Sequence, residues 1–161
     1  MRYNNAIVVV VYNKKIEDSA TLNTLVEHDF FNSKLVIHNN GPESITLKGK
    51  LAEKIEAKFK CVELINSLNN LPLSMLYNDF IKNNEKAGQF IILDDDSTIT
   101  EAFARAVNCN EDDMELPRII SRVDGVTYYP IEAKKVVTTE RYLDHKTSYS
   151  IGSGMVINNS L

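Results

Sequence analysis

Phe90-Ile91-Ile92-Leu93-Asp94-Asp95-Asp96-Ser97-Thr98 is a short apolar run that ends abruptly in three acids. Such a run is typical of a buried strand, because it is too short for an ordinary helix. Ligands of open α/β sheets bind just past the carboxyl ends of the strands, so these acids lie where a ligand site is expected. Side chains alternate along a strand, which places Asp94 and Asp96 on one side, roughly 7 Å apart at Cα. That spacing suits two carboxylates that share one divalent cation.

The charge of this segment also needs an explanation. Three adjacent carboxylates repel one another, and burying them without partners is costly. A cation or a cluster of basic groups would relieve the repulsion. The alternative is an acidic loop that caps the next helix, with Asp96 or Ser97 as the N-cap residue.

Length and composition describe an ordinary globular protein. The chain has 161 residues, enough for one domain with a real core, and is 43% hydrophobic and 25% charged. A net charge of −4 and a pI near 5.4 argue against a nucleic-acid partner, although a nucleotide needs only a local site. Cys61 and Cys109 show no metal-binding spacing, which favours a reduced, cytoplasmic setting. No segment is long enough to span a membrane.

The hydrophobic pattern predicts one α/β domain over residues 1–161. Strands and helices alternate along the first two thirds of the chain, which indicates a mostly parallel sheet with right-handed crossovers. The expected strands are 6–11, 34–38, 60–65 and 89–93, and the expected helices are 19–30, 73–83 and 99–107, with 45–57 ambiguous. Residues 118–122 and 126–129 flank an Asp-Gly turn and predict a β-hairpin, followed by a strand at 135–141. The antiparallel strands are thus added after the parallel sheet.

Several segments, in this order, resemble the family 2 glycosyltransferases, which have the GT-A fold. The resemblance covers nearly the whole chain and rests on the order and spacing of motifs that are individually weak. The matching segments are Val8–Asn13, Val36–Gly41, Asn70–Asn78, Phe90–Asp96 with its Asp-x-Asp signature, Pro117–Pro130 and Ile151–Gly154. It implies a three-layer α/β sandwich of the Rossmann-like type. Residues 1–107 would bind a nucleotide-sugar, and 108–161 would form the hairpin and the start of the acceptor part.

The resemblance also implies an activity and a set of site residues. A family member transfers a sugar from a nucleotide-diphosphate sugar to an acceptor hydroxyl of a glycan or a lipid-linked glycan. Mn²⁺ or Mg²⁺ held by the Asp-x-Asp binds the two phosphates and neutralises charge on the leaving group. Asp96 is then the main metal ligand, Asp94 faces the ribose or the metal, and Asp95 serves in either role. Tyr12 and Asn13 line the base pocket, where the Tyr12 ring stacks on a pyrimidine.

Two departures from the family pattern affect these expectations. Asn39 stands where the family usually has an aspartate that hydrogen-bonds the base; because an amide both donates and accepts, recognition can persist while the base identity is open. The family's general base lies beyond the Gly-containing loop, so we expect this chain to be the donor half of an enzyme without that base. The family setting leaves room for peripheral membrane association of a full-length protein and for a homo-oligomer.

Two other functions fit the same acids. Asp94-x-Asp96-x-Thr98 matches the nucleophile motif of haloacid-dehalogenase-like phosphatases, with Asp94 as nucleophile, Asp96 as acid/base and Mg²⁺ between them. That motif normally opens its domain and is followed by a lysine and an acidic pair after later strands, a pattern that this sequence lacks, so this hypothesis ranks second. The third is a non-catalytic nucleotide-sugar-binding module.

Overall fold

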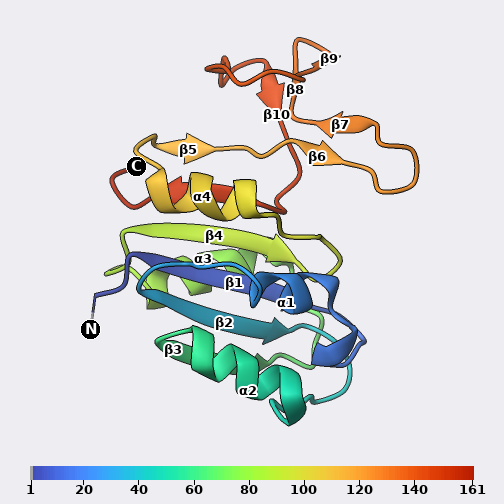
Figure 1. The fold of residues 1–161 in the computed structure, drawn as a ribbon, viewed down its shortest axis with the longest axis vertical. Helices are drawn as coiled ribbons and strands as arrows, with labels where there is room; N and C mark the ends of the chain where they lie inside the picture. Colours follow the sequence, from blue (N-terminus) through green and yellow to red (C-terminus); the bar gives the residue numbers. More distant parts are fainter. Residues whose placement is uncertain (1) are drawn as a thin grey trace.

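The computed structural model describes residues 2–161 and is an α/β structure with a mixed sheet. Six strands form this sheet in the order β3-β2-β1-β4-β11-β5 (Figure 1). The first four are parallel, and β11 pairs antiparallel with both β4 and β5. Their bounds are β1 Asn5–Val11, β2 Ser33–Asn39, β3 Cys61–Asn66, β4 Gln89–Asp94, β5 Met114–Glu115 and β11 Met155–Asn158. The predicted mostly parallel sheet with antiparallel additions is therefore confirmed.

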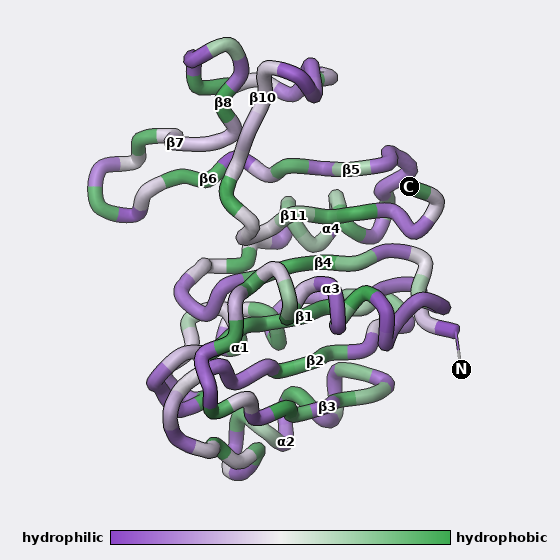
Figure 2. Tube along the Cα trace, turned by 180° about the vertical axis from the view of Figure 1, so that it is seen from behind, coloured by the Kyte–Doolittle hydropathy of each residue, from purple (hydrophilic) through white to green (hydrophobic). Residues whose placement is uncertain are grey.

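Helices cover both faces of the sheet because the central strands are apolar on both sides. In β1, Ile7 and Val9 belong to one hydrophobic cluster, and Ala6 and Val8 belong to another. The first cluster receives the apolar side chains of three helices, and the second receives those of α3. The helices are α1 Ala20–Leu25, α2 Gly49–Lys58, α3 Leu73–Asn83 and α4 Glu101–Cys109, with a 3₁₀ turn at Ile16–Asp18. Figure 2 shows the hydrophobic residues concentrated along the central strands.

The strand order reverses next to β1, and this positions the site. The chain runs outward from β1 through β2 to β3, and then returns so that β4 lies on the other side of β1. Val10 of β1 pairs with Asp94 of β4, so the carboxyl ends of these two strands are neighbours. Such a reversal opens a crevice at the carboxyl ends of an open α/β sheet.

Residues 116–150 form a projecting lobe between β5 and β11 (Figure 1). Its short strands make two small antiparallel sheets, β6-β7 and β10-β8-β9. They are β6 Ile119–Ile120, β7 Thr127–Tyr129, β8 Ile131–Glu132, β9 Lys135–Val136 and β10 Ser148–Tyr149. The lobe contains the predicted hairpin around the Asp-Gly turn.

Three local predictions need correction. The helix expected over 19–30 ends at Leu25, and the strand expected over 135–141 ends at Val136, because β8 offers it only two residues to pair with. The acidic run does not cap the next helix: Thr100 is the N-cap residue of α4, and its hydroxyl accepts from the Phe103 backbone N–H at 3.2 Å. The acids are thus left without that structural role. Over residues 2–161, no helix combines the length and the apolar character needed to cross a membrane.

Candidate functional site

A cavity of about 340 Å³ lies at the carboxyl ends of the parallel strands, where the strand order reverses. Four segments that are far apart in the sequence line it: the ends of β1 and β4, the turn after β2 and the loop before α3. The lining residues are Val10, Tyr12, Asn40, Asn70, Leu71, Leu73, Asp94, Asp95 and Asp96. The position is the one that the strand-end argument predicted for a ligand site.

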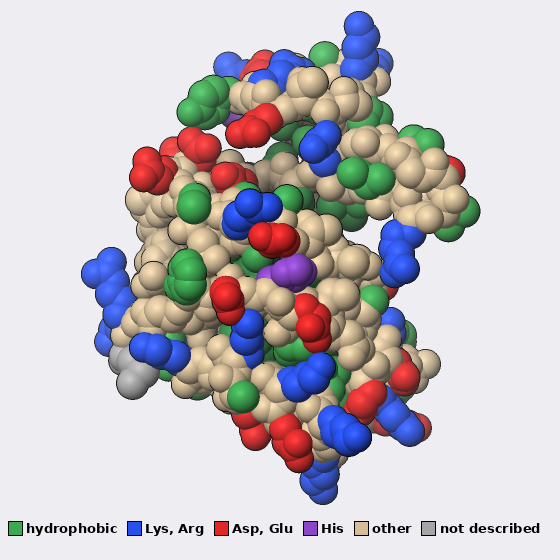
Figure 3. Space-filling model, in the orientation of Figure 1, with side chains coloured by type: hydrophobic (Ala, Val, Ile, Leu, Met, Phe, Trp, Pro, Cys, Tyr) green, Lys and Arg blue, Asp and Glu red, His purple; other side chains and the backbone are tan. Residues whose placement is uncertain are grey.

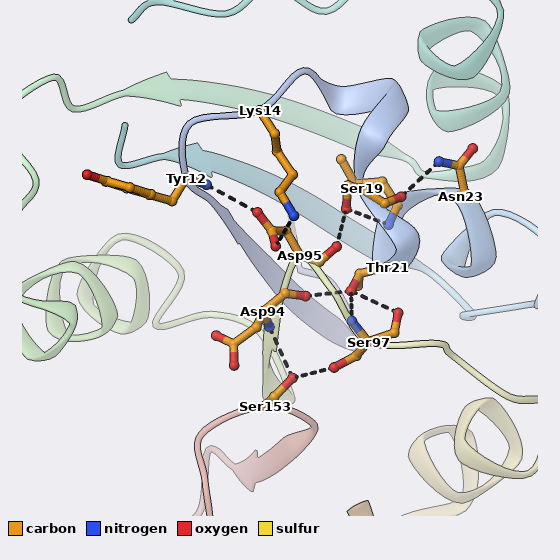
Figure 4. A network of polar contacts seen from close by, with 10 residues as sticks. Tyr12, Lys14, Ser19, Thr21, Asn23, Asp94, Asp95, Ser97 and Ser153 are labelled. Atoms are coloured by element: carbon orange, nitrogen blue, oxygen red, sulfur yellow. Dashed lines mark hydrogen bonds and ion pairs between the residues drawn. The ribbon is translucent and has the colours of Figure 1, made fainter. Parts of the chain in front are cut away.

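Asp95 connects the end of β4 to the loop after β1 (Figure 4). One carboxylate oxygen, Oδ2, accepts from the Tyr12 backbone N–H at 3.2 Å, and Oδ1 forms an ion pair with Lys14 Nζ at 2.8 Å. The Asp95 carbonyl accepts from Ser19 Oγ at 2.9 Å, and Ser19 caps α1. Asp95 is buried, and both of its carboxylate oxygens are occupied. It therefore holds Tyr12 and the β1–α1 loop in place.

Asp94 differs from Asp95 in its surroundings. Its backbone is fixed, because its N–H donates to Ser153 Oγ at 3.1 Å and its carbonyl accepts from Thr21 Oγ1 at 2.5 Å. Its carboxylate points away from that network (Figure 4). Burial raises the pKa of Asp94, and the negative charges of Asp96 and Asp95 raise it further. The Asp94 carboxylate is therefore costly to keep ionised in this position.

Asp96 is exposed at the cavity rim, in the turn that follows β4. Because β4 ends at Asp94, Asp96 does not continue the strand alternation that placed the two side chains on one side. Both still line the same cavity, and within residues 2–161 neither carboxylate has an ion pair or a hydrogen-bond partner. These are the two carboxylates available to a cation.

A divalent cation fits this pair only together with a ligand. No group of three or more His, Cys, Asp or Glu side chains that could hold a metal converges anywhere in the described chain. Mg²⁺ is commonly bound by one or two carboxylates, with substrate phosphates and water completing its shell. Asp94 and Asp96 match that donor set. The raised pKa of Asp94 means that its ionised form is unfavourable, and a bound cation would stabilise that form.

The cavity lining also includes one aromatic ring and two leucine side chains. The Tyr12 ring extends from the end of β1 and is 51% exposed (Figure 4). Leu71 comes from the loop before α3, and Leu73 is the first residue of that helix. Asn40 fixes that loop: its Nδ2 donates to the Leu71 carbonyl at 2.9 Å, and its Oδ1 accepts from the Leu71 N–H at 2.8 Å. One cavity is therefore lined by an aromatic ring, two leucine side chains and carboxylates.

Asn39 and Asn13 are not among the residues that line the cavity. Asn39 is 1% exposed; its Nδ2 donates to the Glu43 carbonyl and to Asn66 Oδ1, and its Oδ1 accepts from the Gly41 N–H. Its amide is thus committed to shaping the turn after β2. Asn13 is exposed and has a left-handed backbone, with φ of 50°. The structure brings Tyr12 together with the three acids, but not these two asparagines.

Sequence reasoning missed Asn40, Asn70, Leu71 and Leu73 as lining residues. Asn39 follows Leu35 and Ile37 on the face covered by α1 and α2, so the next residue, Asn40, turns toward the cavity on the α3 side. Strand alternation was the signal that favoured Asn40 over Asn39.

The glycine-containing loop before β11 closes one side of the site. Ser153 is buried, and its hydroxyl contacts the Asp94 N–H and Ser97 Oγ. The Gly154 N–H donates to the Ile92 carbonyl at 2.7 Å, which continues the pairing of β11 with β4. Tyr77 of α3 lies close by: a Cβ at Gly152 would be 3.8 Å from its hydroxyl. Burial, and then the charge of Asp94, raise the pKa of Tyr77 to about 12, so this phenol stays protonated at neutral pH.

Comparison of the sequence with protein-family models gives no match, and comparison with curated proteins gives none either.

Proposed function

We propose that this chain binds a nucleotide-diphosphate sugar together with Mn²⁺ or Mg²⁺, as the donor-binding core of a glycosyltransferase with a GT-A-like fold. The supporting observation is the single cavity at the strand reversal, which joins the exposed ring of Tyr12 to the unpartnered carboxylates of Asp94 and Asp96. A nucleotide-diphosphate has the matching parts: a flat base that stacks on an aromatic ring, and a diphosphate that binds a cation.

Different residues of the cavity would contact the base and the metal ion. Tyr12 offers its ring to the base, and the Lys14–Asp95 ion pair keeps the Tyr12 backbone in position. Asp94 and Asp96 would hold the metal ion, which supplies positive charge to the diphosphate leaving group. Asn40 and Asn70 form a polar wall of the cavity, in which the Asn40 amide holds the loop before α3 through its bonds to Leu71 and Asn70. The Asn39 amide is committed to hydrogen bonds around the turn after β2, so Asn39 would affect base recognition only through the shape of that turn.

The transfer step needs an acceptor hydroxyl, on a glycan or a lipid-linked glycan, and a general base. We assign no residue of this cavity as that base, because Asp95 is an anchor and Asp94 and Asp96 are the metal ligands. The activity proposed for these 161 residues is therefore donor binding.

Calorimetric titration of UDP, GDP and other nucleoside diphosphates, with and without Mn²⁺, tests the proposal. We expect one diphosphate to bind in a Mn²⁺-dependent manner, and Asp96→Ala to abolish that binding. Asp96 is exposed and has no side-chain partner among the described residues, so the variant should fold normally. The matched control is Asp113→Ala, another exposed acid, which should bind like the unmodified chain.

Two outcomes contradict the proposal. Equal affinity of Asp96→Ala and the unmodified chain in the presence of Mn²⁺ would remove Asp96 as a metal ligand. Absence of nucleotide binding, together with Mg²⁺-dependent hydrolysis of p-nitrophenyl phosphate that Asp94→Asn abolishes, would replace donor binding by the phosphatase hypothesis.

A further inference from the structure

The β6–β7 hairpin presents exposed apolar side chains to solvent, at its turn and along its strands. Asp124 stiffens this turn internally: its carboxylate accepts from the Val126 N–H at 3.1 Å and from the Tyr128 hydroxyl at 3.3 Å. The Ser121 N–H donates to the Val126 carbonyl at 2.9 Å and closes the turn. Val123 is held at the tip with 97% of its surface exposed. A rigid turn with an outward valine contributes nothing to the core.

The apolar surface continues along the hairpin. Ile120, Val126 and Tyr128 are each about half exposed, at 52%, 48% and 49%. Figure 3 shows hydrophobic side chains on this projecting lobe. Single exposed apolar residues need no explanation, but several on one short protruding element are typical of an interaction site.

Charge is distributed unevenly between the lobe and the rest of the chain. Residues 116–150 contain six basic and four acidic side chains, whereas the remaining residues contain twelve basic and eighteen acidic ones. Arg118 and Arg122 flank β6, and each donates to the neighbouring structure, to the Thr138 carbonyl and to Thr98 Oγ1 respectively. An anionic surface would repel the body and attract the lobe, so it would orient the chain with the hairpin toward it.

We propose that the β6–β7 hairpin docks the chain on an anionic lipid surface. A stable protein–protein interface needs about 800 Å² from each partner, which four side chains on one turn do not supply. A bilayer interface accepts a small protrusion: valine and isoleucine enter the acyl boundary, tyrosine lies at headgroup level, and arginine reaches the phosphates. The exposed Tyr142 and Tyr149 of the same lobe add to this composition.

The hairpin lies on the same side of the sheet as the cavity. Arg122 Nη1 donates to Thr98 Oγ1 at 3.2 Å, and Thr98 follows the acidic end of β4. Docking would therefore bring the cavity edge toward the lipid. The lipid contact rests on surface chemistry alone and does not depend on nucleotide binding.

The test uses sedimentation with vesicles and fluorescence. We expect the chain to pellet with vesicles of equal parts phosphatidylcholine and phosphatidylglycerol, and much less with pure phosphatidylcholine or at high salt. Val123→Asp should weaken partitioning roughly tenfold, the factor that accompanies loss of one buried valine. Phe31→Asp is the matched control, since Phe31 is 63% exposed in the loop before β2, at the amino ends of the parallel strands, and should pellet normally.

A second readout reports the contact itself. The chain has no tryptophan, so Val123→Trp and Phe31→Trp each create a single reporter. Anionic vesicles should shift the emission of Val123→Trp to shorter wavelength and leave Phe31→Trp unchanged. Absence of pelleting, or equal pelleting of the unmodified chain and Val123→Asp, would overturn the proposal. So would a dimer that Val123→Asp dissociates, without vesicle binding, because a second copy would then cover the hairpin.

Discussion

Replacing Lys14 by methionine tests the ion pair on which the shape of the site depends. Lys14 Nζ lies 2.8 Å from Asp95 Oδ1, and the two side chains are 30% and 12% exposed. Methionine keeps most of the aliphatic length and removes the charge. The Asp95 carboxylate is then left nearly buried, with the Tyr12 N–H as its remaining hydrogen-bond donor.

The expected decrease in the free energy of unfolding lies between two limits. An exposed ion pair contributes about 0–1 kcal/mol, whereas removing one partner of a fully buried pair costs about 3–5 kcal/mol. Because Lys14 is partly exposed, water replaces some of the lost attraction, and we expect unfolding free energy to fall by about 2 kcal/mol. For a chain of this size, that lowers the melting temperature by about 4–8 °C.

Urea and thermal unfolding, followed by circular dichroism, measure this loss. Lys15→Met is the matched control, because Lys15 is exposed and forms no ion pair within the described residues. The double variant Lys14→Met/Asp95→Asn should lose less than the sum of the single variants, since asparagine still accepts from the Tyr12 N–H without a buried charge. A Lys14→Met variant as stable as Lys15→Met, to within about 0.5 kcal/mol, would refute the account of Asp95 as the anchor of the site.

Two other predictions concern the stability of neighbouring positions. Burial and the adjacent acids raise the pKa of Asp94, so the ionised carboxylate destabilises the folded chain above that raised pKa, and the destabilisation disappears as pH falls toward 3.8. Asp94→Asn should therefore be more stable than the unmodified chain at neutral pH and lose that advantage in acid. A stability advantage that is equal at both pH values, measured by urea unfolding, would contradict this. Gly154→Ala should cost about 2–3 kcal/mol, because Gly154 has φ of +84° and a Cβ would meet Pro117 Cγ at 2.5 Å. Gly125→Ala, with φ of +71° and open space around it, should lose only about 1 kcal/mol, and urea midpoints showing equal losses would contradict the packing argument.

Local sequence patterns were sufficient for the framework of the sheet and for one side of the site. The apolar runs that end at Val11 and Leu93 are buried on both faces, so they marked central strands and the edge of the sheet where the cavity lies. Because Asp94, Asp95 and Asp96 come at the end of the second run, the same pattern predicted that they lie at this edge. Asn39 was misleading because it ends β2 and its amide bonds within the turn that follows, whereas Asn40, just after the strand, lines the cavity.

Long-range contacts account for what local patterns did not reveal. Lys14 and Asp95 are 81 residues apart in the sequence, and only the strand order makes them neighbours. Ser153 reaches Asp94 from 59 residues away, through the antiparallel pairing of β11 with β4. The short strands of the projecting lobe, two or three residues each, carry too little periodicity for their bounds to be predicted.

Paramagnetic broadening of backbone amide signals by Mn²⁺, in the presence of UDP or of whichever nucleoside diphosphate binds, tests the central claim most directly, because it shows where the metal lies. The account predicts broadening centred on Asp94 and Asp96 and extending to Tyr12 and Asn40, dependent on the nucleotide and absent in Asp96→Ala. Broadening centred instead on the exposed acids 111–113, or unchanged when the nucleotide is left out, would contradict a metal–nucleotide site at the end of β4.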